Sequence, residues 1–186
     1  MKIVRIDPKK PDPRHIREAV LVLKRGGLVV YPTETAYALG CDAKNARAMK
    51  RIYGVKGREP KKLLPVIAAS MEMAERIGHM TLDARVLACM YWPGPLTLVL
   101  GKVAVRVSPH PVAHALALAF GRPIVSTSAN RSGEPTKYDV VGILGDLGTT
   151  PDLVLDAGTL KPNPPSTIVR CTEKGNEVLR QGAIKL

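Results

Sequence analysis

The first third of the chain alternates short apolar runs with an amphipathic segment. Residues 2–6 and residues 28–31 are apolar runs too short for a helix, and each predicts a strand. Between them, residues 13–25 carry apolar side chains at helical spacing, and Asp12 followed by a proline is a start signal for a helix. The predicted order is therefore strand, helix, strand.

A second helix, predicted over residues 43–53, has a basic outer face. Its apolar side chains recur every three or four residues, and Gly54 is predicted to end it. The remaining surface carries four cations, Lys44, Arg47, Lys50 and Arg51. We expect this basic face to point to water.

The rest of the chain continues this alternation. Only two residues separate the apolar runs 96–100 and 103–107, which predicts a hairpin. We predict further strands at residues 63–68, 123–126, 153–155, 167–171 and 177–180, and helices at residues 71–77, 82–91, 111–120 and 138–144. Strands and helices do not follow a strict βαβ rhythm. We therefore expect an α/β fold of α+β-like character, a single domain over residues 1–186 in which helices flank a twisted mixed β-sheet.

Length and composition are typical of a globular domain. The chain has 186 residues, of which 45% are hydrophobic and 24% are charged. No apolar run approaches the roughly 18 residues of a membrane-spanning helix. Charges and prolines interrupt the N-terminal segment, so no signal peptide is expected. We therefore predict a cytoplasmic protein that does not bind a membrane.

Cysteine and histidine residues do not form a metal-ligand pattern. Cys41, Cys89 and Cys171 are far apart in the sequence and are expected to be buried free thiols. His110 and His114 are one helical turn apart, but the proline that follows His110 predicts that His110 is a helix N-cap, and no acidic ligand neighbours the pair. No metal site formed by the protein is predicted.

The net charge of +12 is concentrated in the N-terminal third. Residues 1–62 hold 16 Lys and Arg against 6 Asp and Glu, whereas the remaining residues hold 12 against 10. A local excess of positive charge attracts polyanions, either nucleic acid or a polyphosphate ligand. Solubility alone is the alternative explanation.

Three polar segments lie where predicted strands or helices end, which is where open α/β sheets bind ligands. They are residues 32–37, the tripeptide Lys56-Gly57-Arg58, and residues 126–130. Lys and Arg on either side of a glycine can reach one polyphosphate from two directions. Ser128 and Asn130, at alternate positions, are expected to face the same ligand. Solvated or hydrogen-bonded turns are the alternative interpretation of these segments.

The sequence lacks the signatures of several common enzyme classes. It contains no GxGxxG, GxxxxGK[ST], HExxH or GxSxG pattern, so dinucleotide-binding, P-loop, zincin and α/β-hydrolase functions have no sequence support.

Seven segments, in order and over nearly the whole chain, resemble one known family. The segments are PTETAYALG, KGR, WPGPLTLVL, VAVRV, STSANRSGEPT, PSTIVR and LRQGAI, and they resemble the YrdC/TsaC family of threonylcarbamoyl-AMP synthases. The resemblance implies a twisted sheet around a large basic cavity. It also implies that L-threonine, bicarbonate or CO2, and ATP react to give L-threonylcarbamoyladenylate and pyrophosphate, with Mg²⁺ accompanying ATP. Other proteins would then transfer the threonylcarbamoyl group to an adenosine of tRNA.

The resemblance also assigns two sets of site residues. The threonine set comprises Thr35, Arg106, Ser126 and Ser166. The ATP set comprises Lys56, Arg58, Lys62, Lys102, Ser128, Asn130, Thr136 and Arg180, of which Lys56, Arg58, Ser128 and Asn130 are predicted to be catalytic. No step requires a covalent nucleophile, so positioning and charge neutralisation are expected to supply most of the rate.

Four positions depart from the usual pattern of this family. Ala38 replaces a glycine, Glu59 and Leu63 each replace a proline, and Ile67 replaces a residue, often histidine, that lines the threonine pocket in many members. The first three changes concern loop shape and leave the charges intact.

Two other classes of function are considered. A non-catalytic RNA-binding module fits the positive charge, and direct tRNA binding is possible, although aromatic residues at 4% offer few surfaces on which bases stack. A carbamoyl-transfer domain of the hydrogenase-maturation type would share the implied fold, but such domains belong to longer chains with paired cysteines.

Overall fold

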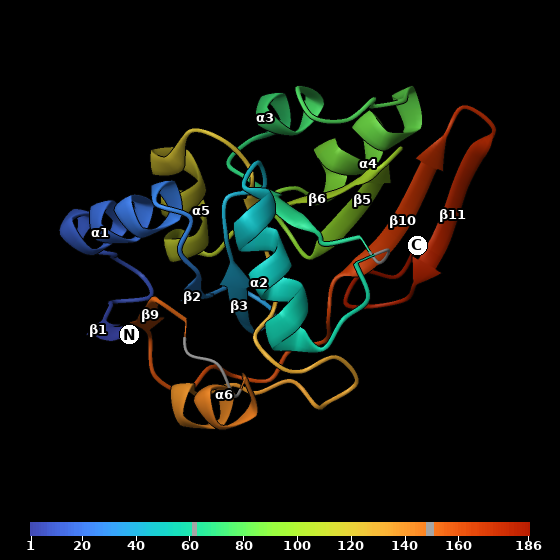
Figure 1. Cartoon of the computed structure of the whole chain (residues 1–186). Coiled ribbons are helices and arrows are strands. Elements are labelled where there is room, and N and C mark those ends of the chain that lie inside the picture. Colours follow the sequence, from blue (N-terminus) through green and yellow to red (C-terminus); the bar gives the residue numbers. More distant parts are fainter. Residues whose placement is uncertain (61–62, 148–150) are drawn as a thin grey trace.

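The computed structural model describes residues 1–60, 63–147 and 151–186, in which the strands divide between two mixed sheets (Figure 1). The strands are β1 Lys2–Arg5, β2 Val29–Pro32, β3 Tyr37–Gly40, β4 Val66–Ala68, β5 Leu96–Leu100, β6 Val103–Val107, β7 Ile124–Val125, β8 Thr127–Ser128, β9 Leu153–Asp156, β10 Thr167–Thr172 and β11 Gly175–Arg180. Their order is β1-β9-β2-β3-β8 in one sheet and β11-β10-β5-β6-β4-β7 in the other. The predicted mixed α/β fold is confirmed, with two sheets in place of the one expected.

Six helices of the described ranges surround these sheets. They are α1 Pro13–Lys24, α2 Ala46–Lys56, α3 Met71–Glu75, α4 Leu82–Tyr91, α5 Pro111–Phe120 and α6 Val140–Leu147. Helices α1 and α5 pack against each other, and both contact β2 (Figure 1). None of the helices in these ranges is long and apolar enough to cross a membrane.

Capping residues place the starts of α1 and α5 as predicted. Asp12 Oδ1 accepts a hydrogen bond from the backbone N–H of Arg14 at 2.8 Å, so α1 begins at the intervening proline. His110 Nδ1 accepts a hydrogen bond from the N–H of Val112 at 3.2 Å, which confirms His110 as the N-cap of α5. These starts depend on local contacts, which explains why the sequence alone locates them.

Helix α2 extends past Gly54, so the predicted end at this glycine is wrong. The helix ends at Gly57, whose φ of +59° lies in the left-handed region that favours glycine. Val55, one residue beyond Gly54, is buried with Ile52. Packing of this extra turn outweighs the low helix propensity of the glycine.

Strand β3 was not predicted, because alanine and glycine have low strand propensity. It pairs antiparallel with β2, with Tyr31 opposite Ala38. The turn between them is closed by a hydrogen bond from the backbone N–H of Thr33 to the carbonyl oxygen of Ala36 at 3.0 Å. This hairpin carries the polar segment 32–37 to the edge of the five-stranded sheet.

Residues 124–128 connect the two sheets, whereas the sequence predicts one strand at residues 123–126. Strand β7 pairs with β4 in the six-stranded sheet, and β8 pairs with β3 in the five-stranded sheet. Ser126, between them, donates its backbone N–H to the carbonyl oxygen of Pro65 at 2.8 Å. The segment that contains the predicted Ser and Asn donors therefore lies where the sheets meet.

The free thiols are not all buried. Cys41 and Cys171 are buried as predicted, but Cys89 is exposed. Helix α4 buries Ala84 and Ala88, and Cys89, the residue after Ala88, is rotated away from the core.

Candidate active site

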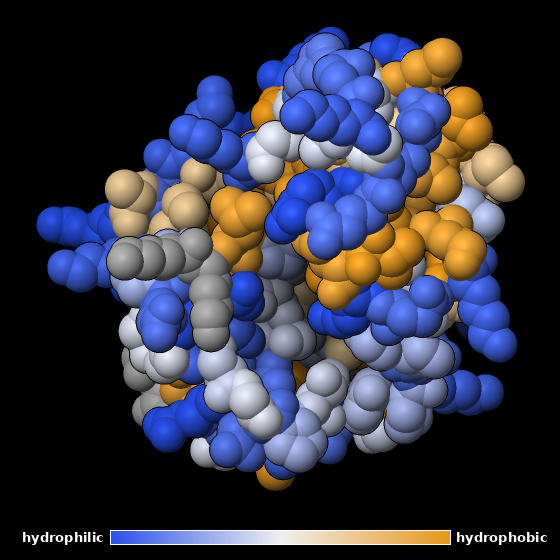
Figure 2. Space-filling model, turned by 90° about the vertical axis from the view of Figure 1, so that its right-hand side faces the viewer, coloured by the Kyte–Doolittle hydropathy of each residue, from blue (hydrophilic) through white to orange (hydrophobic). Residues whose placement is uncertain are grey.

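A cavity of about 530 Å³ is lined by both sheets. Strands β3 and β8 of the five-stranded sheet and strands β4, β5, β6, β10 and β11 of the other contribute residues to its wall. The face of the molecule in Figure 2 is hollowed near its centre, with both hydrophilic and hydrophobic side chains around the hollow. The volume falls in the range of roughly 300–1,000 Å³ that is typical of small-molecule sites.

The structure brings eight of the predicted site residues together around this cavity. The residues are Thr35, Arg58, Arg106, Ser126, Ser128, Thr136, Ser166 and Arg180, and they include all four members of the threonine set. They come from segments spread over most of the sequence, and only the folded chain places them in one wall. Their roles toward a ligand stay predictions.

Lys56 lies behind the cavity wall and is not among the lining residues. Its Nζ donates to the backbone carbonyl oxygens of Ser128 and Asn130, at 2.6 Å in both cases, and the residue is 3% exposed. Burial of the ammonium, together with the nearby charge of Arg58, lowers the pKa of Lys56 from 10.5 to about 8. In this structure Lys56 therefore fixes the loop that presents Ser128 to the cavity.

Two other members of the ATP set, Asn130 and Lys102, also lie outside the cavity lining. Asn130 is buried, and its Nδ2 donates to the carbonyl oxygen of Glu134 at 2.5 Å, so it closes the loop and does not face the cavity with Ser128. Lys102 lies exposed in the β5–β6 turn, outside the cavity lining. Lys62 lies outside the described residues.

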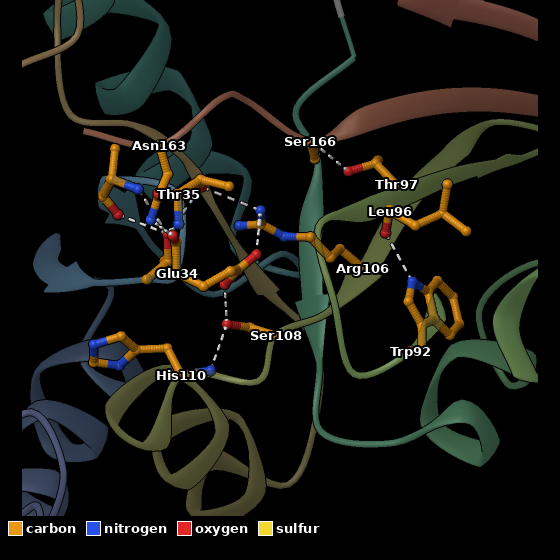
Figure 3. Close-up of polar contacts among 12 residues, drawn as sticks. Glu34, Thr35, Trp92, Leu96, Thr97, Arg106, Ser108, His110, Asn163 and Ser166 are labelled. Carbon is orange, nitrogen blue, oxygen red and sulfur yellow. Dashed lines mark hydrogen bonds and ion pairs between the residues drawn. The ribbon is translucent and has the colours of Figure 1, made fainter. Parts of the chain in front are cut away.

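Arg106 is buried on β6 and contacts the turn between β2 and β3 (Figure 3). Its Nη1 donates to Thr35 Oγ1 at 3.3 Å and lies 2.7 Å from Glu34 Oε1. A guanidinium in this setting offers a planar pair of donors that suits a carboxylate. The arrangement fits the carboxylate of an amino acid.

Two serine hydroxyls of the threonine set have different surroundings. Ser126 Oγ is buried and has no well-aligned hydrogen bond among the described residues, although its interaction with the Tyr31 hydroxyl partly offsets the rise that burial causes in the pKa of that tyrosine. Ser166 Oγ lies 2.9 Å from Thr97 Oγ1, also buried, and accepts a hydrogen bond from Arg180 Nη2 at 3.1 Å. A buried hydroxyl in a cavity wall that has no well-aligned hydrogen bond is available to bond a ligand, because it has already lost its contact with bulk water.

Arginine side chains dominate the charge of the wall. Arg58 Nη2 donates to the carbonyl oxygen of Leu63 at 2.9 Å, while its buried Nε has no partner among the described residues. Arg180 Nη2 donates to the carbonyl oxygen of Ser166 at 2.8 Å. Burial lowers the pKa of Arg180, and the positive charge of Arg106 lowers it further. The guanidinium groups of Arg106 and Arg180 are therefore close enough to repel each other. The described lining contains no Asp or Glu, which favours an anionic ligand.

Several lining residues were missed from the sequence. Thr97 lines the cavity and is the one polar residue of the apolar run 96–100. A single polar residue in a buried strand could have been interpreted as a candidate site residue. Arg170 follows Ile168 at the alternate position on β10, and both line the cavity. Asn163 gave no signal, because the proline-rich segment that carries it has no periodicity.

Comparisons with known proteins identify one family of similar chains. A family model for Sua5, YciO and YrdC proteins, described as "Telomere recombination", matches residues 21–182. The threonylcarbamoyl-AMP synthase of Alkalilimnicola ehrlichii is 38% identical over 186 residues, which cover 90% of this chain and 97% of that protein. The enzyme of the same name from Vibrio cholerae is 36% identical over 185 residues, with the same coverage. The crystal structure of P. abyssi Sua5 complexed with L-threonine has a TM-score of 0.91 and 34% identity, covering 98% of this chain and 58% of that chain.

Proposed function

The chain belongs to the Sua5/YciO/YrdC family, and on this basis we propose that it is a threonylcarbamoyl-AMP synthase. In the proposed reaction the threonine amine adds to CO2, or to bicarbonate with loss of water, and gives a carbamate. A carbamate oxygen then attacks the α-phosphorus of ATP and pyrophosphate leaves. The product, L-threonylcarbamoyladenylate, supplies the group that modifies tRNA.

One observation carries this proposal: a single cavity combines the complete threonine set with Arg58 and Arg180, for which no ion pair is found in the described residues. Arg106 and Thr35 suit the carboxylate of the amino acid, and the Ser126 hydroxyl, which has no well-aligned hydrogen bond of its own, offers it a further one. When threonine and ATP share the cavity, the carbamate that forms on the amine lies near the α-phosphorus, and proximity supplies a large part of the rate.

The ATP phosphates are proposed to bind the arginines and hydroxyls of the remaining wall. Arg58 and Arg180 offer charge-assisted donors, and Ser128 and Thr136 offer hydroxyls. These donors offset the charge that builds on the phosphate oxygens as pyrophosphate leaves.

Mg²⁺ is proposed to enter with ATP and to be held by phosphates and water. The described lining offers hydroxyls and cations, and no group of three or more His, Cys, Asp or Glu side chains suited to a metal is found in the described residues. Such a wall fits a nucleotide that brings its own cation. A cytoplasmic location and delivery of the product to tRNA-modifying proteins belong to the same proposal.

The proposal is tested by mass spectrometry of the purified protein mixed with ATP, L-threonine, bicarbonate and Mg²⁺. Threonylcarbamoyladenylate and pyrophosphate are expected only when all three substrates are present. Pyrophosphate release that does not depend on threonine would contradict the proposal. Tight binding of tRNA without any binding of ATP or threonine would favour the RNA-binding module instead.

A further inference from the structure

Glu34 lies beside the cavity without lining it, and its carboxylate connects the turn between β2 and β3 to the end of β6 (Figure 3). Its Oε1 is 2.7 Å from Arg106 Nη1, and its Oε2 accepts a hydrogen bond from Ser108 Oγ at 2.5 Å. The side chains of Glu34 and Arg106 are 16% and 10% exposed, and Ser108 is 1% exposed. The three residues form a shielded unit in which Ser108 holds the carboxylate and the carboxylate holds the arginine.

Most donors of the Arg106 guanidinium remain unused in this unit. Glu34 Oε1 has no aligned hydrogen bond, so its contact with Arg106 is an ion pair and not a directed bond. Among the described residues, the hydrogen bond found for the guanidinium is the one to Thr35 Oγ1. Because a guanidinium has five N–H donors, the pair with Glu34 leaves donors for a ligand in the cavity that Arg106 lines.

A counter-charge at this position is physically necessary. Arg106 is buried, and its charge acts on Arg180, which lines the same cavity. Burial of a charged group costs free energy, and a second cation nearby repels it. An opposite charge is needed to offset both costs. Glu34, which does not line the cavity, supplies that charge at 2.7 Å from Arg106 Nη1.

The chain holds Glu34 at its backbone as well as at its carboxylate. Asn163, which lines the cavity, donates its Nδ2 to the carbonyl oxygen of Glu34 at 2.9 Å, so the segment before β10 fixes the turn. Ser108 is itself fixed, because its Oγ accepts a hydrogen bond from the backbone N–H of His110 at 3.2 Å. The carboxylate therefore has little freedom to follow a movement of Arg106.

We propose that Glu34, held by Ser108, is a positioning residue that orients the Arg106 guanidinium toward the carboxylate of the amino-acid substrate. The proposal rests on the proposed function for the identity of that substrate. Glu34 touches no substrate atom in this scheme and acts only through Arg106.

The first test compares Glu34→Gln with the wild-type protein. Glutamine keeps the size of the side chain and an oxygen for Ser108 but removes the charge. We expect the KM and the Kd for threonine to rise roughly 10- to 100-fold, as for the loss of a charge-assisted contact, while the KM for ATP changes less than twofold. Glu34→Asp, which restores the charge on a shorter side chain, should recover part of the threonine affinity. Equal increases in both KM values would overturn the proposal.

A matched control is Asp42→Asn, which removes the charge of another buried carboxylate that is paired with an arginine. Asp42 is bonded to Arg122 at 2.6 and 3.1 Å, and neither residue lines the cavity. This variant should lower the melting temperature and leave the KM for threonine unchanged. A threonine KM that rises as much in Asp42→Asn as in Glu34→Gln would show that general destabilisation causes the effect.

A double-variant cycle tests whether Glu34 acts through Arg106. In an Arg106→Ala background, Glu34→Gln should change threonine affinity less than twofold. An undiminished effect in that background would overturn the positioning role.

A crystal structure of Glu34→Gln gives a readout that does not depend on activity. A guanidinium displaced from its wild-type position supports the proposal, and an unmoved one contradicts it. Should the wild-type protein fail to bind threonine, the proposed function fails, and this structure still decides the role of Glu34.

Discussion

Arg106 is paired with Glu34 at 2.7 Å, whereas Arg58 and Arg180, which line the same cavity, donate to backbone carbonyl oxygens at 2.9 and 2.8 Å. No ion pair is found for either of the latter two in the described ranges. The threonine set therefore contains a neutralised arginine, and the ATP set contains two whose charge is not offset by a carboxylate.

This difference matches the charge of the two proposed substrates. An amino acid is a zwitterion, so its site needs an oriented donor more than it needs net charge. ATP is a polyanion. The backbone carbonyl oxygens that accept from Arg58 and Arg180 are uncharged, so both arginines keep their full positive charge for the phosphates. Arg170, which also lines the cavity, is paired with Glu177 at 2.7 Å, but that pair is exposed, whereas the pair of Arg106 and Glu34 is shielded. The structure teaches that one cavity can separate orientation from charge by giving Arg106 a shielded carboxylate partner and leaving Arg58 and Arg180 without one.

The largest expected effect comes from breaking the neutralised pair. Arg106→Ala leaves Glu34 buried without its partner, so we expect the free energy of unfolding to fall by about 3–5 kcal/mol and threonine-dependent turnover to be lost. Denaturant titration and the pyrophosphate assay measure the two effects. The double variant Glu34→Ala/Arg106→Ala should regain much of the stability and none of the turnover. A single variant as stable as the wild type would show that the pair is not buried in solution.

An uncompensated arginine should behave differently. Arg58→Ala removes a charge-assisted bond to phosphate, and we expect ATP affinity to fall by about 1.5–3 kcal/mol with the melting temperature of the free protein unchanged. Isothermal titration with a non-hydrolysable ATP analogue and calorimetric melting provide the measurements. Lys50→Ala, on the exposed face of α2, is the control and should leave affinity intact. Lower stability with unchanged affinity would make Arg58 structural.

Lys56 extends the comparison to a cation buried behind the wall. Its pKa of about 8 lies below the unfolded value of 10.5, so the unfolded chain binds more protons between these pH values. The free energy of unfolding of the wild type, relative to Lys56→Met, should therefore rise with pH, by about 2 kcal/mol between pH 7.5 and pH 10. Denaturant titrations of both proteins across this range give the difference. A difference that stays constant or falls with pH would contradict the lowered pKa.

The smallest expected effect concerns Ser128, which is exposed and lines the cavity on the loop that Lys56 holds. Ser128→Ala should reduce ATP affinity by about 0.5–1.5 kcal/mol and leave the melting temperature of the free protein unaltered. The same titration and melting experiments apply. A destabilised variant with unchanged affinity would remove Ser128 from the site.

Elements that depend on neighbouring residues agree best with the sequence prediction. The hairpin of β5 and β6 and the helices α4 and α5 have the predicted boundaries. Caps, turn length and apolar spacing depend on residues that are close together in the sequence, so the sequence alone predicts the elements that they define. Strand β3 was missed, because its low-propensity residues become a strand only through pairing with β2 and β8.

The sequence by itself determined the set of chemical groups, through the ordered segments that contain Arg58, Arg106 and Ser128. Only the tertiary structure decided which of them face the cavity. Lys56 and Arg58 are two residues apart in the sequence. Lys56 donates to the carbonyl oxygen of Ser128, which is 72 residues further along the chain, whereas Arg58 lines the cavity. Glu34 likewise acquires its position from Ser108, 74 residues away. Burial and charge pairing arise from contacts between segments that are distant in the sequence, and local sequence patterns do not predict such contacts.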